Sequence, residues 1–233
     1  SSVPESPSFD RAAAQASGGT LDVLRAHWRL AIYAIILMTA FNFFSHGTQD
    51  IYPTFLQVQH KLEPHTVSLI AVVYNIGAIC GGILFGSLSE VFGRRRCIVI
   101  ASLLSIVVIP LWAFSESVVL LAVGAFFMQF MVQGAWGVVP VHLNELSPGS
   151  ARGTFPGVVY QLGNLLASVN ATLQAAIAAH LGGNYSIALA AVAGTVAVVI
   201  AVLTMLGEEA KGVDFATVKV PPRDVSEPAS LRA

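Results

Sequence analysis

A line of polar residues at helical spacing is the part of this sequence best suited to chemistry. Asn42, His46 and Asp50 are four residues apart, so on a helix they lie in a single line. Ser45 and Gln49 lie on the flank of that line. We call these five residues the polar stripe. They end a long apolar run, and polar groups on a membrane helix usually face a cavity or another helix. Because histidine and aspartate both exchange protons, the polar stripe is the predicted binding place for a solute or a proton.

The neutral side chains of the polar stripe also have a purely structural interpretation. Amides and hydroxyls often bridge neighbouring membrane helices, where such hydrogen bonds average about 0.6 kcal/mol. The histidine and the aspartate are harder to explain in this way, because both are titratable and lie one turn apart. Pro53 follows the stripe and removes the backbone bond to Gln49, so we expect the helix to kink or end there.

The thirteen residues from Asn42 to Thr54 also resemble a known signature. The pattern N-x-x-[S/H]-H-x-[S/T]-Q-D-x-x-x-T is typical of carboxylate permeases of the major facilitator superfamily, which include the fungal lactate/pyruvate permeases and the bacterial sialate:proton symporters. The seven specified positions all match: Asn42, Ser45, His46, Thr48, Gln49, Asp50 and Thr54. The resemblance implies that these seven residues form the substrate and proton pathway.

The same resemblance implies a fold and an activity. In that family the segment belongs to the seventh of twelve helices, so this chain would be the C-terminal six-helix half. The chain has no initiator Met, and we expect it to be an excerpt whose partner is the N-terminal half of the same transporter. The implied activity is proton symport of a small carboxylate such as lactate or pyruvate, by alternating access, with sialic acid as the alternative substrate.

Composition independently indicates an integral membrane protein. Hydrophobic residues make up 55% of the chain, charged residues 11%, and the mean hydropathy is +0.72. Soluble domains carry about 25% charged residues. The net charge of -1 predicts no basic surface for nucleic acid. Cys80 and Cys97 form neither a C-x-x-C motif nor a disulfide framework.

Apolar runs predict six membrane crossings. A spanning helix needs about 20 mainly apolar residues. Four runs qualify directly: 30–50 and beyond, 66–89, 97–114 and 117–141. The stretch 153–207 contains no Asp, Glu, Lys or Arg and is too long for one crossing, so it must cross twice, with a turn at Gly182-Gly183-Asn184. The predicted fold is an all-α integral membrane bundle of six transmembrane helices, half of a twelve-helix major facilitator fold.

The positive residues predict how the bundle lies in the membrane. Eleven of the twelve Lys and Arg fall on the side of the chain ends, and only Lys61 falls opposite. Positive residues favour the cytoplasmic side, so both ends are predicted to be cytoplasmic, in a plasma or bacterial inner membrane. The predicted organisation is a cytoplasmic linker over 1–26, the six-helix bundle over 27–207 and a cytoplasmic tail over 208–233.

Two loops on that side resemble superfamily motifs. The segment 86–95 is similar to G-x-x-x-D-x-x-G-R-[R/K], with Glu90 in place of the usual Asp, and 145–153 is similar to E-x-x-P-x-x-x-R-G. The alternative is that both are simply positive loops that set topology. The predicted gating residues are Gly86, Glu90, Gly93, Arg94, Arg95, Glu145, Pro148, Arg152 and Gly153.

Other polar residues within the spans are expected to pack helices rather than to bind a ligand. They are Asn75, Gln129, Gln133, Gln161, Asn164, Asn170 and Gln174. Trp136 could shape a cavity, but a single buried Trp is more often part of a core. No Lys or Arg lies inside a span, so protonated His46 is the titratable candidate for pairing with a carboxylate. Otherwise the positive group comes from the other half or from a helix N-terminus.

Two other classes of protein fit the sequence less well than a transporter. A membrane enzyme is disfavoured because the histidines are scattered and no H-x-x-x-H or H-E-x-x-H motif occurs. A non-transporting membrane subunit would leave the polar stripe unexplained. We expect no metal or other cofactor. The predicted partners are the carboxylate, protons, the other half of the transporter and the lipid bilayer.

Overall fold

The structure of the chain is a computed structural model that describes residues 25–207 and 209. Within these residues every regular element is a helix and none is a strand, which confirms the predicted all-α class. The elements are α3 (Trp28–Gln49), α4 (Tyr52–Val58), α5 (Pro64–Phe92), α6 (Arg94–Ala113), α7 (Val118–Leu146), the 3-10 helix η1 (Gly149–Ala151), α8 (Phe155–Ala167), α9 (Asn170–His180) and α10 (Tyr185–Leu206). The predicted linker, 1–26, and tail, 208–233, lie almost entirely outside the described residues.

Six helical segments are long and apolar enough to cross a membrane, as predicted. Two of them are discontinuous: the first crossing consists of α3 and α4, and the fifth of α8 and α9. The turn between the last two crossings lies where the glycines predict it. Gly182 and Gly183 have φ angles of 68° and 88°, a region that favours glycine.

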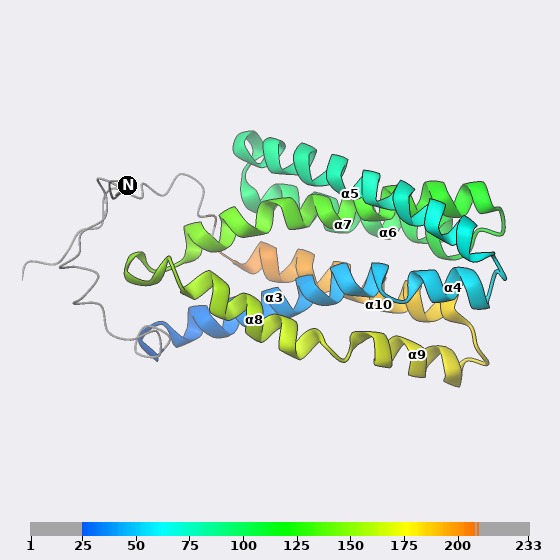
Figure 1. Cartoon of the computed structure of the whole chain (residues 1–233). Helices are drawn as coiled ribbons and strands as arrows, with labels where there is room; N and C mark the ends of the chain where they lie inside the picture. Colours follow the sequence, from blue (N-terminus) through cyan, green and yellow to red (C-terminus); the bar gives the residue numbers. More distant parts are fainter. Residues whose placement is uncertain (1–24, 208, 210–233) are drawn as a thin grey trace, which may run out of the picture.

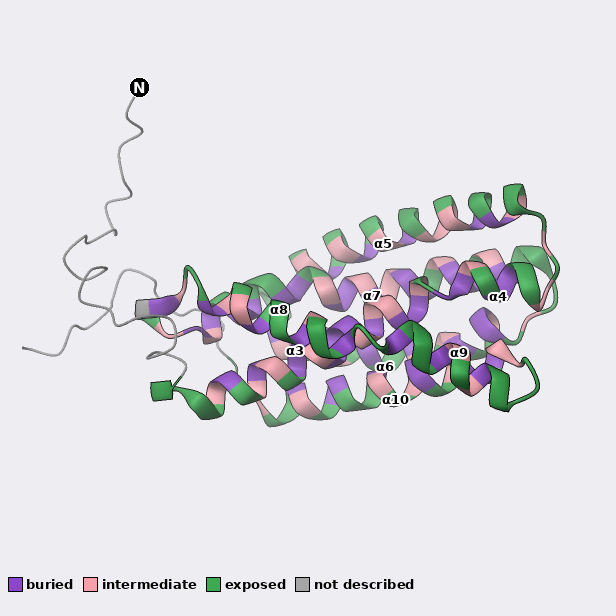
Figure 2. Cartoon of the chain, turned by 60° about the horizontal axis from the view of Figure 1, so that its bottom comes forward, coloured by how far each residue is buried: buried purple, intermediate pink, exposed green. Residues whose placement is uncertain are grey.

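The helices run side by side, and the described chain enters and leaves the bundle at one end (Figure 1). That end also holds the α5–α6 and α7–α8 turns, which carry the two predicted motifs. Most packing is between α5 and α7, between α6 and both α7 and α10, and between α3 and both α8 and α10. Outward faces are apolar, as lipid contact requires: Ile83 and Val107 are 67% and 74% exposed, and the outer side of α5 is exposed along its length (Figure 2).

Glycines allow α5 to approach α7 closely. A Cβ on Gly81 would overlap the carbonyl oxygen of Phe130, and one on Gly77 would overlap that of Phe126. A Cβ on Gly86 would instead lie at an ordinary 3.7 Å from the Gly137 carbonyl oxygen. Gly77 and Gly81, four residues apart on one face of α5, therefore set the distance between the two helices, whereas an alanine at Gly86 would fit.

The break between α3 and α4 has the predicted cause. Pro53 has no N–H to donate to Gln49, so the helical bonding pattern stops at Asp50 and restarts with the Phe55 N–H donating to the Ile51 carbonyl at 3.0 Å. Buried Tyr52 then anchors α4, since its ring stacks on another aromatic ring of α6. This is Trp112, with centroids 5.2 Å apart, and the Tyr52 hydroxyl lies 3.2 Å from its carbonyl oxygen.

The break between α8 and α9 is not predicted from the sequence. It falls between Ala167 and Asn170, where neither proline nor glycine occurs. The side chains that open α9 bond instead to the backbone of α3: Gln174 Nε2 donates to the Gly47 carbonyl at 3.0 Å. Tertiary bonds, rather than a local breaker, accompany this interruption, and it lies beside the polar stripe.

Candidate functional site

The polar stripe faces a pocket of about 390 Å³. Three helices contribute to it: α3 supplies the stripe, α7 supplies two residues and α8 one. The lining residues are Asn42, Ser45, His46, Gln49, Asp50, Gln133, Trp136 and Tyr160. The structure therefore brings five of the seven residues of the predicted pathway to one cavity.

His46 and Asp50 form an ion-pair geometry in this pocket. His46 Nδ1 lies 3.1 Å from Asp50 Oδ2 and 3.3 Å from Oδ1, one helical turn away. Each side chain is 45% exposed, so both remain accessible from the cavity. The two groups are close enough to exchange or share a proton, and when protonated the imidazole is the positive group among the pocket residues.

Amides hold the serine of the stripe in place. Gln49 Nε2 and Gln133 Nε2 each donate to Ser45 Oγ at 2.9 Å. The hydroxyl thus accepts two hydrogen bonds, and among the described residues no acceptor is bonded to its proton. The bond from Gln133 of α7 therefore helps to orient the Ser45 hydroxyl, whose hydrogen is available to a ligand.

The remaining predicted pathway residues differ in their surroundings. Asn42 is buried and lines the pocket, although its amide donates to the Met38 carbonyl of its own helix at 2.9 Å. Thr48 is also buried but faces α7, where its hydroxyl oxygen accepts from Gln129 Nε2 at 2.9 Å. Thr54 is exposed on α4 and does not line the pocket. The roles of Thr48 and Thr54 in the pathway stay predictions.

Three pocket residues were not predicted as site residues. Gln133 was expected to pack helices, Trp136 to be part of a core or to shape a cavity, and Tyr160 was not singled out. The Trp136 ring contacts Phe41 and Tyr160, with centroids 5.8 and 6.0 Å apart, and its buried Nε1–H has no partner within the described chain. The signal available in the sequence was the spacing of Gln129, Gln133 and Trp136, which share a face of α7.

Asn170 and Gln174 pack helices as expected, whereas Asn75 and Gln161 are exposed. Gln174 Nε2 donates to Gly47 and to Asn170 Oδ1, at 3.0 and 3.1 Å, and Asn170 Nδ2 donates to Phe43 at 3.5 Å. These bonds tie α9 to the backbone of α3 at Phe43 and Gly47. In the described part of the chain, no group of three or more His, Cys, Asp or Glu is placed to hold a metal ion.

The predicted gating motifs meet at the chain-end side of the bundle. Arg94 is only 4% exposed and bonds to Glu145 through Nη2 at 3.0 Å and Nε at 3.2 Å. Its Nη1 contacts Glu90 at 2.8 Å and donates to Ser89 Oγ at 2.8 Å. The Arg94 guanidinium thus joins three helices. It links α6 to α7 by a bidentate bond to Glu145 and to α5 by contacts with Ser89 and Glu90.

An acidic residue outside both motifs completes this network. Glu209 accepts from the backbone N–H groups of Arg94 and Arg95, at 3.3 and 3.2 Å, where α6 begins. Arg95 in turn donates to the Thr204 and Met205 carbonyls at the end of α10. Glu209 was not predicted, because no local pattern indicates which helix start it will reach.

The other motif residues occupy turns or helix contacts. Gly93 has a φ of 94° and separates α5 from α6, as a tight turn requires. Gly86 lies against α7, and Pro148 precedes η1. Arg152 is half-buried and Gly153 exposed in the turn before α8. These positions place the motif residues in turns and helix contacts, and their gating role stays a prediction.

Comparison with known proteins identifies relatives with the same kind of sequence. A carboxylic acid transporter protein homolog of Saccharomyces cerevisiae is 38% identical over 156 residues, which cover 66% of this chain and 25% of the yeast protein. The probable metabolite transport protein CsbC of Bacillus subtilis is 31% identical over 100 residues, or 43% of this chain and 22% of that protein. The chain thus spans about a quarter of the length of these relatives.

A third relative and a family profile point the same way. Mouse solute carrier family 2, facilitated glucose transporter member 3, is 32% identical over 99 residues, covering 41% of this chain and 20% of the mouse protein. These relatives carry the names of transporters, so the alternative of a membrane enzyme is set aside. The profile described as Major Facilitator Superfamily matches residues 22–232. With that match and six membrane-capable helices, the chain is a multi-pass membrane protein with half of a major facilitator fold, and it belongs to the major facilitator superfamily.

Proposed function

We propose that this chain is the C-terminal half of a secondary active transporter that moves a small carboxylate, such as lactate or pyruvate, together with a proton. The observation that carries this proposal is the pocket in which His46 and Asp50 lie 3.1 Å apart beside hydrogen-bond donors. Sialic acid, a larger carboxylate, is the alternative substrate. The yeast relative's name, carboxylic acid transporter, supports a carboxylate.

Charge balance explains why a proton and a carboxylate would enter together. In this proposal the site without substrate holds protonated His46 and ionised Asp50, which together have no net charge. A carboxylate alone would leave one uncompensated negative charge within the membrane, which is costly. If Asp50 takes up a proton as the carboxylate binds His46, the site stays neutral. Transport would then carry one proton for each monocarboxylate.

Neighbouring donors suit the shape of such a substrate. The free hydroxyl hydrogen of Ser45 and the unpartnered indole N–H of Trp136 can bond carboxylate or hydroxyl oxygens, while the aromatic faces of Trp136 and Tyr160 accommodate a short carbon chain. In this proposal Asn42 and Gln49 mainly orient the stripe. Among the described residues no Lys or Arg lines the pocket, so a second positive group would come from the other half of the transporter.

Alternating access requires a second bundle on the open side of this site. We propose that the N-terminal six-helix half covers the pocket and that the two halves rock around it. The Arg94–Glu145–Glu90 contacts would then hold the chain-end side of this half in one of its states. The proposed location is the plasma or inner membrane, with 1–26 and 208–233 as cytoplasmic segments around the bundle.

The test is uptake by the complete protein reconstituted in lipid vesicles. An inward proton gradient should drive accumulation of labelled lactate, and unlabelled pyruvate should compete while glucose should not. Abolishing the gradient should leave exchange but remove accumulation. Preferential accumulation of sialic acid would select the alternative substrate, and uptake of glucose without any effect of the gradient would overturn the proposal.

A further inference from the structure

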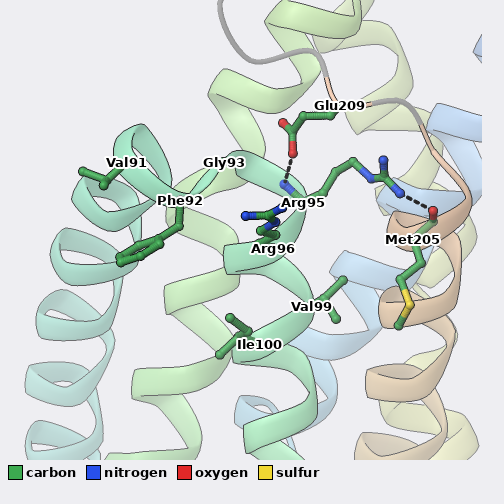
Figure 3. Close-up of a pocket in the computed structure, with 9 residues that line it drawn as sticks. All are labelled: Val91, Phe92, Gly93, Arg95, Arg96, Val99, Ile100, Met205 and Glu209. Atoms are coloured by element: carbon green, nitrogen blue, oxygen red, sulfur yellow. Dashed lines mark hydrogen bonds between the residues drawn. The ribbon is translucent and has the colours of Figure 1, made fainter.

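A second cavity, of about 610 Å³, lies at the arginine-rich end of the bundle. It is separate from the pocket that the polar stripe faces, which we call the transport pocket. It is formed where α5 ends, α6 begins and α10 ends (Figure 3). Its lining residues are Val91, Phe92, Gly93, Arg95, Arg96, Val99, Ile100, Met205 and Glu209.

One part of this cavity is positively charged. The Arg95 guanidinium donates to the Thr204 and Met205 carbonyls, which fix its position. Among the described residues no carboxylate forms an ion pair with it. The Arg96 side chain is exposed and makes no hydrogen bond or ion pair within the described chain. The acidic residue, Glu209, already accepts two backbone N–H bonds at the start of α6. Two guanidinium groups and one carboxylate therefore line the cavity, which leaves an excess of positive charge.

The other part is apolar and open to the surroundings. Val91 and Phe92, on the last turn of α5, are 71% and 55% exposed, and Ile100 and Met205 are 49% and 51% exposed. Figure 3 shows the α5 pair on one side and Met205 of α10 on the other, with Arg96 on α6 between them. Apolar walls with guanidinium groups at one end suit an amphiphile, not a free ion.

We propose that this cavity binds one anionic phospholipid, with its phosphate on Arg96 and Arg95 and its acyl chains along Phe92 and Ile100. Guanidinium groups often form bidentate hydrogen bonds to phosphate oxygens, and basic pockets between membrane helices bind anionic head groups. A zwitterionic lipid gains less there, since two guanidinium groups and one carboxylate line the cavity and its ammonium group would meet the excess positive charge. This site is separate from the transport pocket and does not depend on the proposed substrate.

The test measures lipids retained by the complete purified protein. Native mass spectrometry after exposure to equal amounts of phosphatidylglycerol and phosphatidylcholine should show phosphatidylglycerol bound preferentially. Arg96→Gln should lower that bound fraction about fivefold, the effect of one arginine at an anionic membrane surface. The matched control is Arg29→Gln, which removes an exposed charge at the same end outside the cavity and should change binding less than about twofold.

A second pair of variants tests the apolar wall. Ile100→Ser should also weaken phosphatidylglycerol binding, whereas Val107→Ser, a more exposed site on the same helix, should not. Equal retention of the two lipids, or equal losses in Arg96→Gln and Arg29→Gln, would overturn the proposal. Displacement of the lipid by millimolar glycerol phosphate would show a site for free anions and would overturn it as well.

Discussion

Replacing Glu145 with glutamine should destabilise the bundle far more than the same change at Glu90. Both carboxylates contact Arg94, at 3.0 and 2.8 Å, but their surroundings differ. The side chains of Arg94 and Glu145 are each 5% exposed, whereas that of Glu90 is 65% exposed. Glu145→Gln therefore leaves the buried guanidinium with one charged partner, the exposed Glu90.

The size of the effect follows from this difference in burial. Removing one partner of a buried ion pair costs about 3–5 kcal/mol, and the remaining contacts of Arg94 favour the lower end, about 3 kcal/mol. Removing an exposed partner costs about 0–1 kcal/mol. For a bundle of this size each kcal/mol shifts the melting temperature by about 2–4 °C, so Glu145→Gln should lower it by about 6–12 °C and Glu90→Gln by at most about 4 °C.

The assay is thermal unfolding of the purified complete protein, with both single variants and the double variant Arg94→Met/Glu145→Met. Replacing both members of a buried pair by apolar groups is often close to neutral, so the double variant should recover most of the loss caused by Glu145→Gln. Equal shifts for the two glutamine variants, or an additive loss in the double variant, would refute the account of this network as a buried ion pair.

Three further predictions concern topology, packing and pH. A cysteine at Lys61 should react with an impermeant label from outside, and one at Arg152 only after permeabilisation; the reverse would contradict the predicted orientation. Gly81→Val should greatly reduce the yield of folded protein, since α5 and α7 are in backbone contact there, while Gly86→Ala should be tolerated; similar yields would contradict the packing. Burial lowers the pKa of His60, in the loop before α5, so the unfolded chain takes up a proton before the folded one does. Thermal stability should therefore fall as the pH drops below about 6.5, and His60→Gln should reduce that fall; an unchanged curve would count against it.

Periodicity and length made much of the fold predictable. The uncharged stretch 153–207 exceeds one membrane thickness, so two crossings and a glycine turn were required, and both are present. Spacing by four also placed His46 and Asp50 together, because neighbours on one helix face are set by local geometry. Pro53 indicated the first helix break for the same local reason.

Features that depend on tertiary contacts could not be predicted in this way. The α8–α9 break has no proline or glycine, and its bonds run to Gly47 on a distant helix. Glu209 reaches the start of α6 from more than a hundred residues away. Trp136 and Tyr160 line the pocket only because α7 and α8 pack against α3, and a periodic pattern does not specify which helices become neighbours.

The proposed coupling of a proton to a carboxylate by His46 and Asp50 is tested by uptake per inserted transporter across about pH 5.5–7.5. His46→Ala removes the charge that would bind the substrate. It should weaken apparent substrate affinity about tenfold or more, the worth of a charged hydrogen bond, and flatten its pH dependence. Asp50→Asn should abolish gradient-driven accumulation while sparing downhill exchange, because the substrate partner remains but the proton site is gone. Unchanged affinity and pH dependence in His46→Ala, or full accumulation by Asp50→Asn, would contradict the account.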